Sequence, residues 1–360
     1  MSIGTPEGLS DEPRELRAED SFDVDALQQW VHRHVPDMTV DNPHVRQFPG
    51  GASNLTYLLS YPDREVILRR PPAGTKAASA HDMKREFTIQ DRLRPTFGQV
   101  PTVLALCTDE SVIGSEFYLM ERVPGVILRG NLPDGLTLSS AEARSLSESM
   151  VDTLVALHEV DVDAAGIADL GKGGGYVARQ VGGWSRRFRA ARTDNVPDFE
   201  DVMSWLDSRQ PDDVGYGVVH GDFRMDNLVL NPDGFTVTAL LDWELATLGD
   251  PLMDLGSAMA YWVQADDDEG MQMARRQPTN LPGMLSRDEF VARYCAARGL
   301  AADNWTFYEV FGLFRLAVIA QQIYYRFHHG QTTNPVFEHF WLFVAYAEQR
   351  CRRLAGLATG

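Results

Sequence analysis

A histidine, an asparagine and two aspartates recur at short spacing in the C-terminal half of the sequence. His220 precedes Asp222 by two positions, Asn227 follows five positions later, and Asp242 comes after two apolar runs. The runs flank residues 231–234, which read Asn-Pro-Asp-Gly and are typical of a β-hairpin turn. We expect the hairpin to bring Asp242 back beside Asp222 and Asn227.

These residue types suit phosphoryl transfer. A carboxylate can accept or orient the proton of an attacking hydroxyl, and Mg²⁺ prefers hard oxygen ligands such as Asp and Asn. Each residue alone is also a common turn former or cap. The ordered set of Asp222, Asn227 and Asp242 favours the catalytic interpretation, because a kinase-type signature uses these residue types in this order.

The elements that must position these residues fall into two groups. A chain of 360 residues exceeds the usual size of one core, so two lobes are expected. Strand patterns dominate residues 44–121, in the order three strands, one helix, two strands, and helical patterns dominate after residue 125. The sequence therefore predicts an α+β fold with a five-stranded N-terminal lobe and a helical C-terminal lobe. The predicted boundaries are a flexible tail over 1–21, a nucleotide-binding lobe over 22–122 and a catalytic and substrate lobe over 123–360.

Residues 218–256 resemble the core of the aminoglycoside phosphotransferase family, which belongs to the protein-kinase-like superfamily. The sequences LRRPP at 68–72, REF at 85–87 and GDPLMDLG at 249–256 are similar to a branch associated with acyl-CoA dehydrogenases. The resemblance implies a bilobal kinase-like fold, and ATP and Mg²⁺ as cofactors. It also implies transfer of a phosphoryl group to the hydroxyl of a small molecule.

The resemblance also implies roles for matched residues. Asp222 would be the catalytic base or hydroxyl-orienting residue, and Asn227 and Asp242 would be the magnesium ligands. His220 would brace the loop. Glu244 would either support the metal ligands or lie on the surface. The aspartates at 250 and 254 would be structural, as a helix cap or as acceptors for the catalytic loop.

A loop of small residues lies between the first two predicted strands, where this fold places a phosphate-covering loop. Small side chains let backbone N–H groups approach phosphate oxygens, although a plain hairpin turn is the alternative. The loop comprises Gly50, Gly51, Ala52, Ser53 and Asn54.

The third predicted strand and the helix after it would complete the nucleotide site. Strand alternation puts Ile67 and Arg69 on one face. Kinases usually place a lysine where Arg69 falls, and the sequence leaves open whether Arg69 or Arg70 contacts phosphate. Glu86 is the expected ion-pair partner, with a solvated helix position as the alternative. At the hinge between the lobes, the backbone of Glu121 and Val123 would bind adenine.

The composition limits partners and location. A net charge of -18 and a pI of about 4.9 argue against nucleic acid and anionic membranes as partners. Three widely spaced cysteines, and an acidic N-terminus without a signal pattern, predict a cytoplasmic protein. Polar residues interrupt the apolar stretch over 305–325, which predicts a buried helix instead of a membrane span.

Several interpretations stay open at this point. A glycine-rich loop over 171–175 could be a substrate-side loop, and the arginines within 186–192 could meet an anionic substrate or form a solvated helix face. The acceptor could be an aminoglycoside or a hydroxyacyl metabolite, and we favour the metabolite. A nucleotide-binding pseudokinase that regulates a partner protein is the alternative function. A protein kinase is disfavoured because the sequence contains no Asp-Phe-Gly or Ala-Pro-Glu motif.

Overall fold

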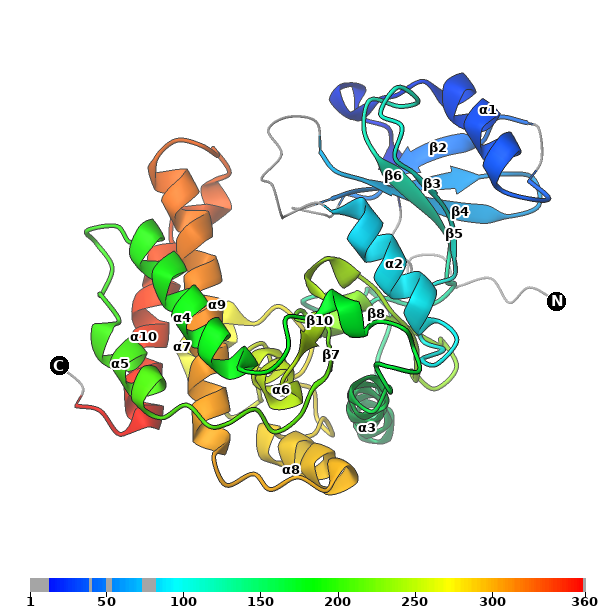
Figure 1. The fold of residues 1–360 in the computed structure, drawn as a ribbon. Helices are drawn as coiled ribbons and strands as arrows, with labels where there is room; N and C mark the ends of the chain where they lie inside the picture. Colours follow the sequence, from blue (N-terminus) through cyan, green and yellow to red (C-terminus); the bar gives the residue numbers. More distant parts are fainter. Residues whose placement is uncertain (1–12, 39–40, 50–53, 73–81, 359–360) are drawn as a thin grey trace.

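An antiparallel sheet dominates the N-terminal part of the chain (Figure 1). The computed structural model describes residues 13–38, 41–49, 54–72 and 82–358. The sheet has six strands in the order β1-β2-β3-β4-β6-β5. The strands are β1 (Arg14–Glu15), β2 (His44–Gln47), β3 (Leu55–Ser60), β4 (Glu65–Arg70), β5 (Val103–Cys107) and β6 (Phe117–Glu121).

The sixth strand corrects the prediction of five strands. Strand β1 lies inside the segment predicted to be a flexible tail, and it pairs Arg14 with Gln47 and Glu15 with Arg46 of β2. A 3₁₀ helix over Ala18–Asp20 follows it. The two residues of β1 are exposed, so they carry no alternation of apolar and polar side chains. These two residues form a strand because their backbone pairs with the open edge of β2. Such pairing leaves no periodic pattern in the sequence.

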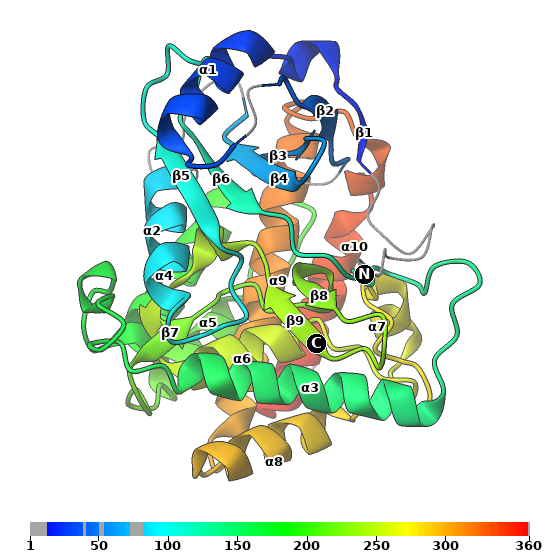
Figure 2. The ribbon, with the colours of Figure 1, turned by 90° about the vertical axis from the view of Figure 1, so that its right-hand side faces the viewer.

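Two helices cover opposite faces of the sheet. The apolar side of α1 (Val24–His34) packs with alternate sheet residues such as Leu68. The helix α2 (Met83–Leu93) packs with Ile67 on the other face. Adjacent residues of β4 therefore point to different helices. In Figures 1 and 2 the helix α2 reaches from the sheet toward the helical part of the chain.

Helices make up most of the C-terminal part (Figure 2). They are α3 (Ser140–His158), α4 (Tyr176–Ala191), α5 (Glu200–Ser208), α6 (Pro251–Met259), α7 (Glu269–Ala274), α8 (Arg287–Arg298), α9 (Trp305–His328) and α10 (Phe340–Ala355). Two short antiparallel ladders pair β7 (Gly217–Val219) with β10 (Thr247–Gly249) and β8 (Leu228–Leu230) with β9 (Val237–Leu240). Within the described ranges, no helix has the length and apolar character to cross a membrane.

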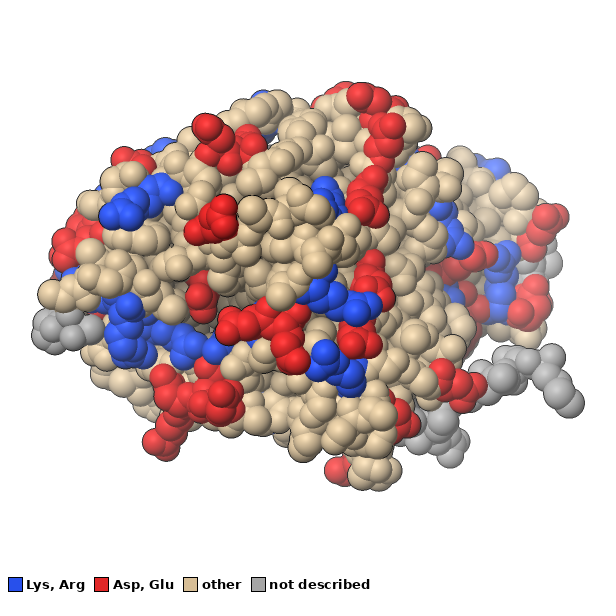
Figure 3. Space-filling model, turned by 90° about the horizontal axis from the view of Figure 1, so that it is seen from below, with Lys and Arg blue, Asp and Glu red and all other residues tan. Residues whose placement is uncertain are grey.

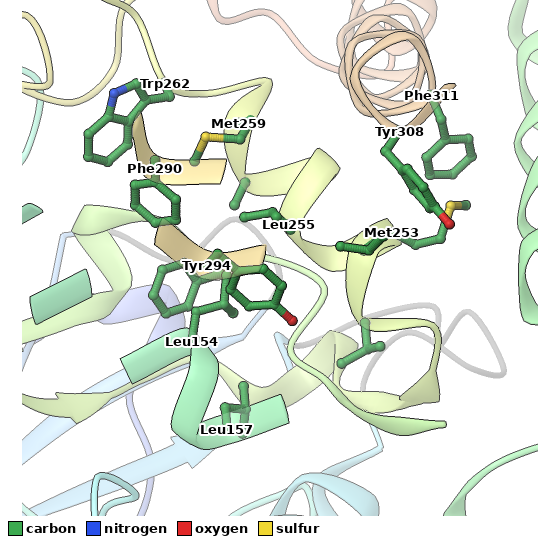
Figure 4. Close-up of a cluster of buried hydrophobic side chains, with 14 of the residues drawn as sticks. Leu154, Leu157, Met253, Leu255, Met259, Trp262, Phe290, Tyr294, Tyr308 and Phe311 are labelled. Carbon is green, nitrogen blue, oxygen red and sulfur yellow. The ribbon is translucent and has the colours of Figure 1, made fainter. Parts of the chain in front are cut away.

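Helix α6 lies in the middle of the C-terminal core (Figure 4). Its residues Leu255 and Met259 lie among side chains of α3, α8 and α9. Helices α6 and α9 approach closely at Gly256 and Gly312, where a Cβ added at Gly312 would lie 2.0 Å from the Gly256 carbonyl oxygen. Glycine is therefore required at this crossing, because a side chain at Gly312 would push α6 away from α9.

The surface carries both signs of charge. On the face shown in Figure 3, basic side chains lie in small groups that alternate with acidic ones. The cysteines Cys107, Cys295 and Cys351 are buried and free. Burial raises the pKa of the Cys295 thiol.

Candidate active site

A cavity of about 350 Å³ lies between the sheet and the helical part, and we call it the first cavity. Both parts of the chain line it. The sheet side contributes Asn54, Ile67 and Arg69, and the helical side contributes Asp222, Asn227 and Asp242. The structure thus brings together residues that are far apart in the sequence, such as Asn54 and Asp242, which are 188 positions apart.

The loop after β7 holds Asp222 and Asn227 in one geometry. The Asn227 side-chain Nδ2 donates to the Asp222 backbone oxygen at 2.9 Å and to its Oδ2 at 3.1 Å. Both contacts use the amide N–H groups of Asn227, so its Oδ1 is the atom that can bind a cation. The hairpin of β8 and β9 closes with a hydrogen bond from the Leu241 N–H to the Asn227 carbonyl oxygen at 2.8 Å. As predicted for this hairpin, Asp242 returns to the same cavity.

The backbone of Asp242 has an unusual conformation. Its φ of 66° and ψ of 65° lie in the left-handed region, which non-glycine residues seldom occupy. Such conformations persist where surrounding contacts fix them, and they concentrate at functional sites. Here the Arg69 Nη2 donates to Asp242 Oδ1 at 2.8 Å.

Arg69 joins two carboxylates across the two lobes. Besides Asp242, its Nε lies 3.2 Å from Glu86 Oε1, an ion pair in which both side chains are nearly inaccessible to solvent. Burial alone would lower the pKa of Arg69, but the charges of Glu86 and Asp242 outweigh it and raise the pKa. Tyr118 also donates to Glu86 at 2.9 Å. The ion pair expected between strand and helix is therefore present.

Arg70 points to the opposite face of the sheet. Its guanidinium donates to the Tyr57 hydroxyl at 3.0 Å and to the carbonyl oxygens of Ile113 and Asp20. Of the two arginines that the sequence left open, only Arg69 lines the first cavity among the described residues.

Buried polar contacts brace the catalytic loop from below. Asp254 of α6 accepts the backbone N–H groups of His220 at 2.7 Å and Gly221 at 2.9 Å. His158 lies 3.2 Å from the same carboxylate. His220 is fully buried, accepts the Asp222 N–H at its Nδ1 and donates from Nε2 to the Leu241 carbonyl at 3.0 Å. His220 thus contacts Asp222 itself and Leu241, which precedes Asp242, so it braces the loop and the end of the hairpin.

The structure also shows the contacts of Asp250 and Glu244. Asp250 is the N-cap of α6 and accepts the Leu252 and Met253 N–H groups. Glu244 lines the first cavity and accepts from Asn54 Nδ2 at 3.0 Å, so it is not a plain surface residue. Of the predicted phosphate-covering loop, Gly50, Gly51, Ala52 and Ser53 lie outside the described residues.

Glu121 and Val123, which the sequence predicts to form the hinge, line the first cavity. The Glu121 backbone N–H already donates to the Thr102 carbonyl at 2.8 Å. For adenine binding, Glu121 would therefore offer its carbonyl, and Val123 would offer its backbone groups.

A second, larger cavity adjoins the first. It measures about 930 Å³ and shares Arg129, Arg224 and Asp226 with the first cavity. Its walls are mostly apolar and come mainly from α7, α9, α10 and the 3₁₀ helix over Pro335–Phe337. Representative lining residues are Leu316, Ile319, Ile323, Phe337, Phe340 and Phe343.

Sequence reasoning did not single out Arg224. Its Nε lies 3.1 Å from Asp222 Oδ1, its Nη2 lies 3.3 Å from Asp226 Oδ2, and its guanidinium lies 4.9 Å from the Tyr261 ring centroid. The available signal was its position two residues after Asp222 on the loop, with the buried Phe223 between them. The arginines of α4 line neither cavity, and Arg189 pairs with Glu200 at 2.6 Å.

Comparison with known proteins agrees with this geometry. Residues 44–311 match the family described as "Phosphotransferase enzyme family". The chain belongs to this phosphotransferase family. It is 38% identical over 323 residues to acyl-CoA dehydrogenase family member 10 of Mus musculus and 34% identical over 328 residues to family member 11 of Rattus norvegicus. Each match covers 89% of this chain but only 30% and 42% of those relatives.

Solved structures show the same fold. A crystal structure from Ralstonia eutropha, provisionally assigned as an aminoglycoside phosphotransferase, is 31% identical with a TM-score of 0.80, over 94% of this chain and 100% of that chain. The aminoglycoside phosphotransferase APH(4)-Ia, solved with AMP-PNP and hygromycin B, is 15% identical with a TM-score of 0.56, over 93% and 99% of the two chains. The predicted α+β kinase-like fold and the family resemblance are confirmed.

Proposed function

We propose that this phosphotransferase moves the γ-phosphoryl group of ATP to a hydroxyl of a small molecule with the help of Mg²⁺. The observation that carries the proposal is the convergence of Asp222, Asn227 and Asp242 with Arg69 on one cavity between the lobes. Carboxylate, amide and guanidinium groups in one cavity match the needs of phosphoryl transfer, which depends on positioning and charge neutralisation.

The donor set fits Mg²⁺. This ion keeps water and phosphate oxygens as ligands and takes one or two protein oxygens. The Asn227 Oδ1 and the Asp242 carboxylate would hold it, since the amide N–H groups of Asn227 are already directed to Asp222. The bound ion would neutralise phosphate charge.

Asp222 would act on the acceptor hydroxyl. Its carboxylate lines the first cavity beside Arg224, which leads into the second cavity. In this function Asp222 orients the hydroxyl and receives its proton while the hydroxyl oxygen attacks the γ-phosphorus. Arg69 would contact the phosphates of the nucleotide, because its guanidinium lies at the cavity wall and can bridge two oxygens.

The second cavity favours an acceptor with an apolar part. Its largely aliphatic and aromatic walls suit an acyl chain better than a polycationic aminoglycoside, whose amines would lose hydration there. The relatives named as acyl-CoA dehydrogenase family members agree with this preference, although this chain spans less than half of their length. A hydroxyacyl metabolite is therefore the substrate class that we propose.

Two variants test this function. Replacing Asp242 with Asn should abolish Mg²⁺-dependent turnover while ATP binding without metal remains. Replacing Ile319 with Trp should narrow the second cavity and raise the KM for an apolar hydroxylated acceptor at least about 10-fold. Basal ATP hydrolysis should not change in the Ile319 variant. An aminoglycoside that stimulates turnover equally in the wild type and the Ile319→Trp variant would contradict the proposed acceptor class.

The pseudokinase alternative rests on Arg69. Its guanidinium occupies the usual lysine position and is hydrogen-bonded to Asp242, one of the proposed metal ligands. In that alternative the protein would bind nucleotide without Mg²⁺-dependent turnover. Comparing ATP binding with ATP consumption, each with and without Mg²⁺, separates the two functions.

A further inference from the structure

Arg224 lies where the two cavities meet. Only three residues line both cavities among the described residues, and these are Arg129, Arg224 and Asp226. Arg129 is exposed, whereas Arg224 is partly buried and its guanidinium is stacked on the Tyr261 ring. A phosphoryl group that leaves a nucleotide in the first cavity for an acceptor in the second must pass this junction.

The contacts of Arg224 hold its charge at that junction. Its Nε lies 3.1 Å from Asp222 Oδ1 and its Nη2 lies 3.3 Å from Asp226 Oδ2. Burial alone would lower the pKa of Arg224, but Asp222 and Asp226 outweigh it and raise the pKa. The side chain therefore remains a cation beside the proposed catalytic carboxylate. Packing against Tyr261 restricts its motion, which reduces the entropy that is lost when it binds an anion.

One hydrogen-bond donor of Arg224 is unsatisfied. The Nε is buried and, although it is close to Asp222, it makes no aligned hydrogen bond to any described residue. A buried N–H without an acceptor costs free energy, and an anionic oxygen at the junction would satisfy it. The Arg69 Nε is likewise buried without an aligned hydrogen bond, but it lies 3.2 Å from Glu86, and Glu86 does not line the second cavity.

We infer that Arg224 is a further catalytic residue, whose guanidinium contacts the phosphoryl group during transfer between the two cavities. This inference rests on the proposed function. The acceptor oxygen forms a bond to the γ-phosphorus, the bond from phosphorus to the β,γ-bridging oxygen breaks, and ADP leaves with the electron pair. The hydroxyl proton goes to Asp222. Arg224 neutralises negative charge on the equatorial oxygens of the group in transfer, as an arginine finger does.

The test uses the full chain and needs no acceptor. ADP with Mg²⁺ and aluminium fluoride mimics the planar phosphoryl group, and transition-state mimics bind more tightly than ground-state ligands. The Kd of ADP is measured with and without aluminium fluoride for the wild type, Arg224→Gln and Arg224→Lys. Arg293→Gln is the matched control, since Arg293 pairs with Asp152 on the surface. Basal ATP hydrolysis is measured for the same proteins.

We expect aluminium fluoride to tighten ADP binding to the wild type about 100-fold or more. In Arg224→Gln this tightening should fall at least 10-fold and hydrolysis about 100-fold or more, while the Kd of ADP alone stays within about 3-fold. In Arg224→Lys, both the tightening and the hydrolysis rate should lie between those of the wild type and Arg224→Gln. The Lys variant replaces Arg224→Gln in the comparison if the Gln variant does not fold. Arg293→Gln should match the wild type.

Three other outcomes would contradict the inference, the proposed function or both. Full tightening in Arg224→Gln with normal hydrolysis would overturn the inference and leave the proposed function intact. Full tightening with slower hydrolysis would also overturn it, since Arg224 would then act only by positioning Asp222. A wild type that neither hydrolyses ATP nor binds the aluminium fluoride complex would refute the proposed function itself, and the inference with it.

Discussion

The guanidinium of Arg69 donates a hydrogen bond to the carboxylate of Asp242 at 2.8 Å, and this contact joins strand β4 of the sheet to the hairpin that carries the proposed metal ligand. The same guanidinium lies 3.2 Å from the buried carboxylate of Glu86. One cation thus balances two carboxylates that come from different lobes. The relative position of the lobes and the charge of the site therefore depend on the same side chain.

Replacing Arg69 with Met should destabilise the fold. The change leaves the Glu86 carboxylate buried without its cation, and breaking a buried ion pair costs about 3–5 kcal/mol. Urea unfolding should show this loss in the free energy of unfolding. The double variant Arg69→Met, Glu86→Gln should recover part of it, because no buried charge remains. The exposed pair of Arg189 with Glu200 provides the control, and Arg189→Met should cost less than about 1 kcal/mol.

Replacing Asp254 with Asn should weaken the support of the catalytic loop. Each oxygen of the Asp254 carboxylate accepts one backbone N–H, from His220 or from Gly221. In the Asp254→Asn variant the NH₂ group would replace one of these oxygens, so two hydrogen-bond donors would oppose each other. We expect a loss of about 2–3 kcal/mol in the free energy of unfolding at pH 7. The exposed Asp288→Asn is the control and should change this free energy by less than about 0.5 kcal/mol.

The same variant should alter the pH dependence of stability. Burial alone would raise the pKa of Asp254, but the hydrogen bonds from His158 and the loop outweigh it and lower the pKa below its ordinary value of 3.8. An acid with a lowered folded-state pKa stabilises the fold above its unfolded-state pKa, and this stabilisation is lost as the pH falls through the folded-state value. The gap between wild type and Asp254→Asn should be constant above about pH 5 and narrow below about pH 4. A gap that widens on acidification would contradict this assignment.

Adding a methyl group at Gly312 should separate α6 from α9. The Cβ would lie 2.0 Å from the Gly256 carbonyl oxygen, so the helices must move apart. Gly312→Ala should lower the free energy of unfolding by at least about 2 kcal/mol. Gly183 in α4 is the matched control, since a Cβ there meets nothing within 4 Å. Gly183→Ala should raise stability by up to about 1 kcal/mol, and equal losses in both variants would contradict the packing explanation.

Local sequence patterns predicted the elements that depend on local forces. The strand-rich segment over 44–121 contains β3 and β4, and in the helical part the Ser-x-x-Glu sequences at Ser139 and Ser286 form the capping boxes that begin α3 and α8. Strand β1 escaped prediction because an edge pairing of two exposed residues needs no apolar pattern. The sequence could also not decide between Arg69 and Arg70, although strand alternation sends them to opposite faces, because it does not show which face carries the cavity.

The missed part of the site depends on contacts between distant segments. Arg224 gains its position from Tyr261, which follows α6, and from the junction of the first cavity with the second, whose walls include α7, α9 and α10. Gln277 accepts the Met225 N–H at 2.6 Å and so fixes the same loop from a segment 52 residues away. Spacing along the chain contains no signal for such contacts. The motif of Asp222, Asn227 and Asp242 was visible because one loop and one hairpin hold it.

The most direct test of the account is ATP consumption with Mg²⁺, measured for the wild type and Asp222→Ala against hydroxylated small molecules. The set would include hydroxyacyl-CoAs, aminoglycosides, choline and homoserine, and ATP binding would be measured in parallel. We predict that a hydroxyacyl compound stimulates the wild type and that Asp222→Ala loses at least about 100-fold of that turnover while it still binds ATP. Undiminished stimulated turnover in Asp222→Ala, or ATP binding without turnover in the wild type for every compound, would contradict the proposed function.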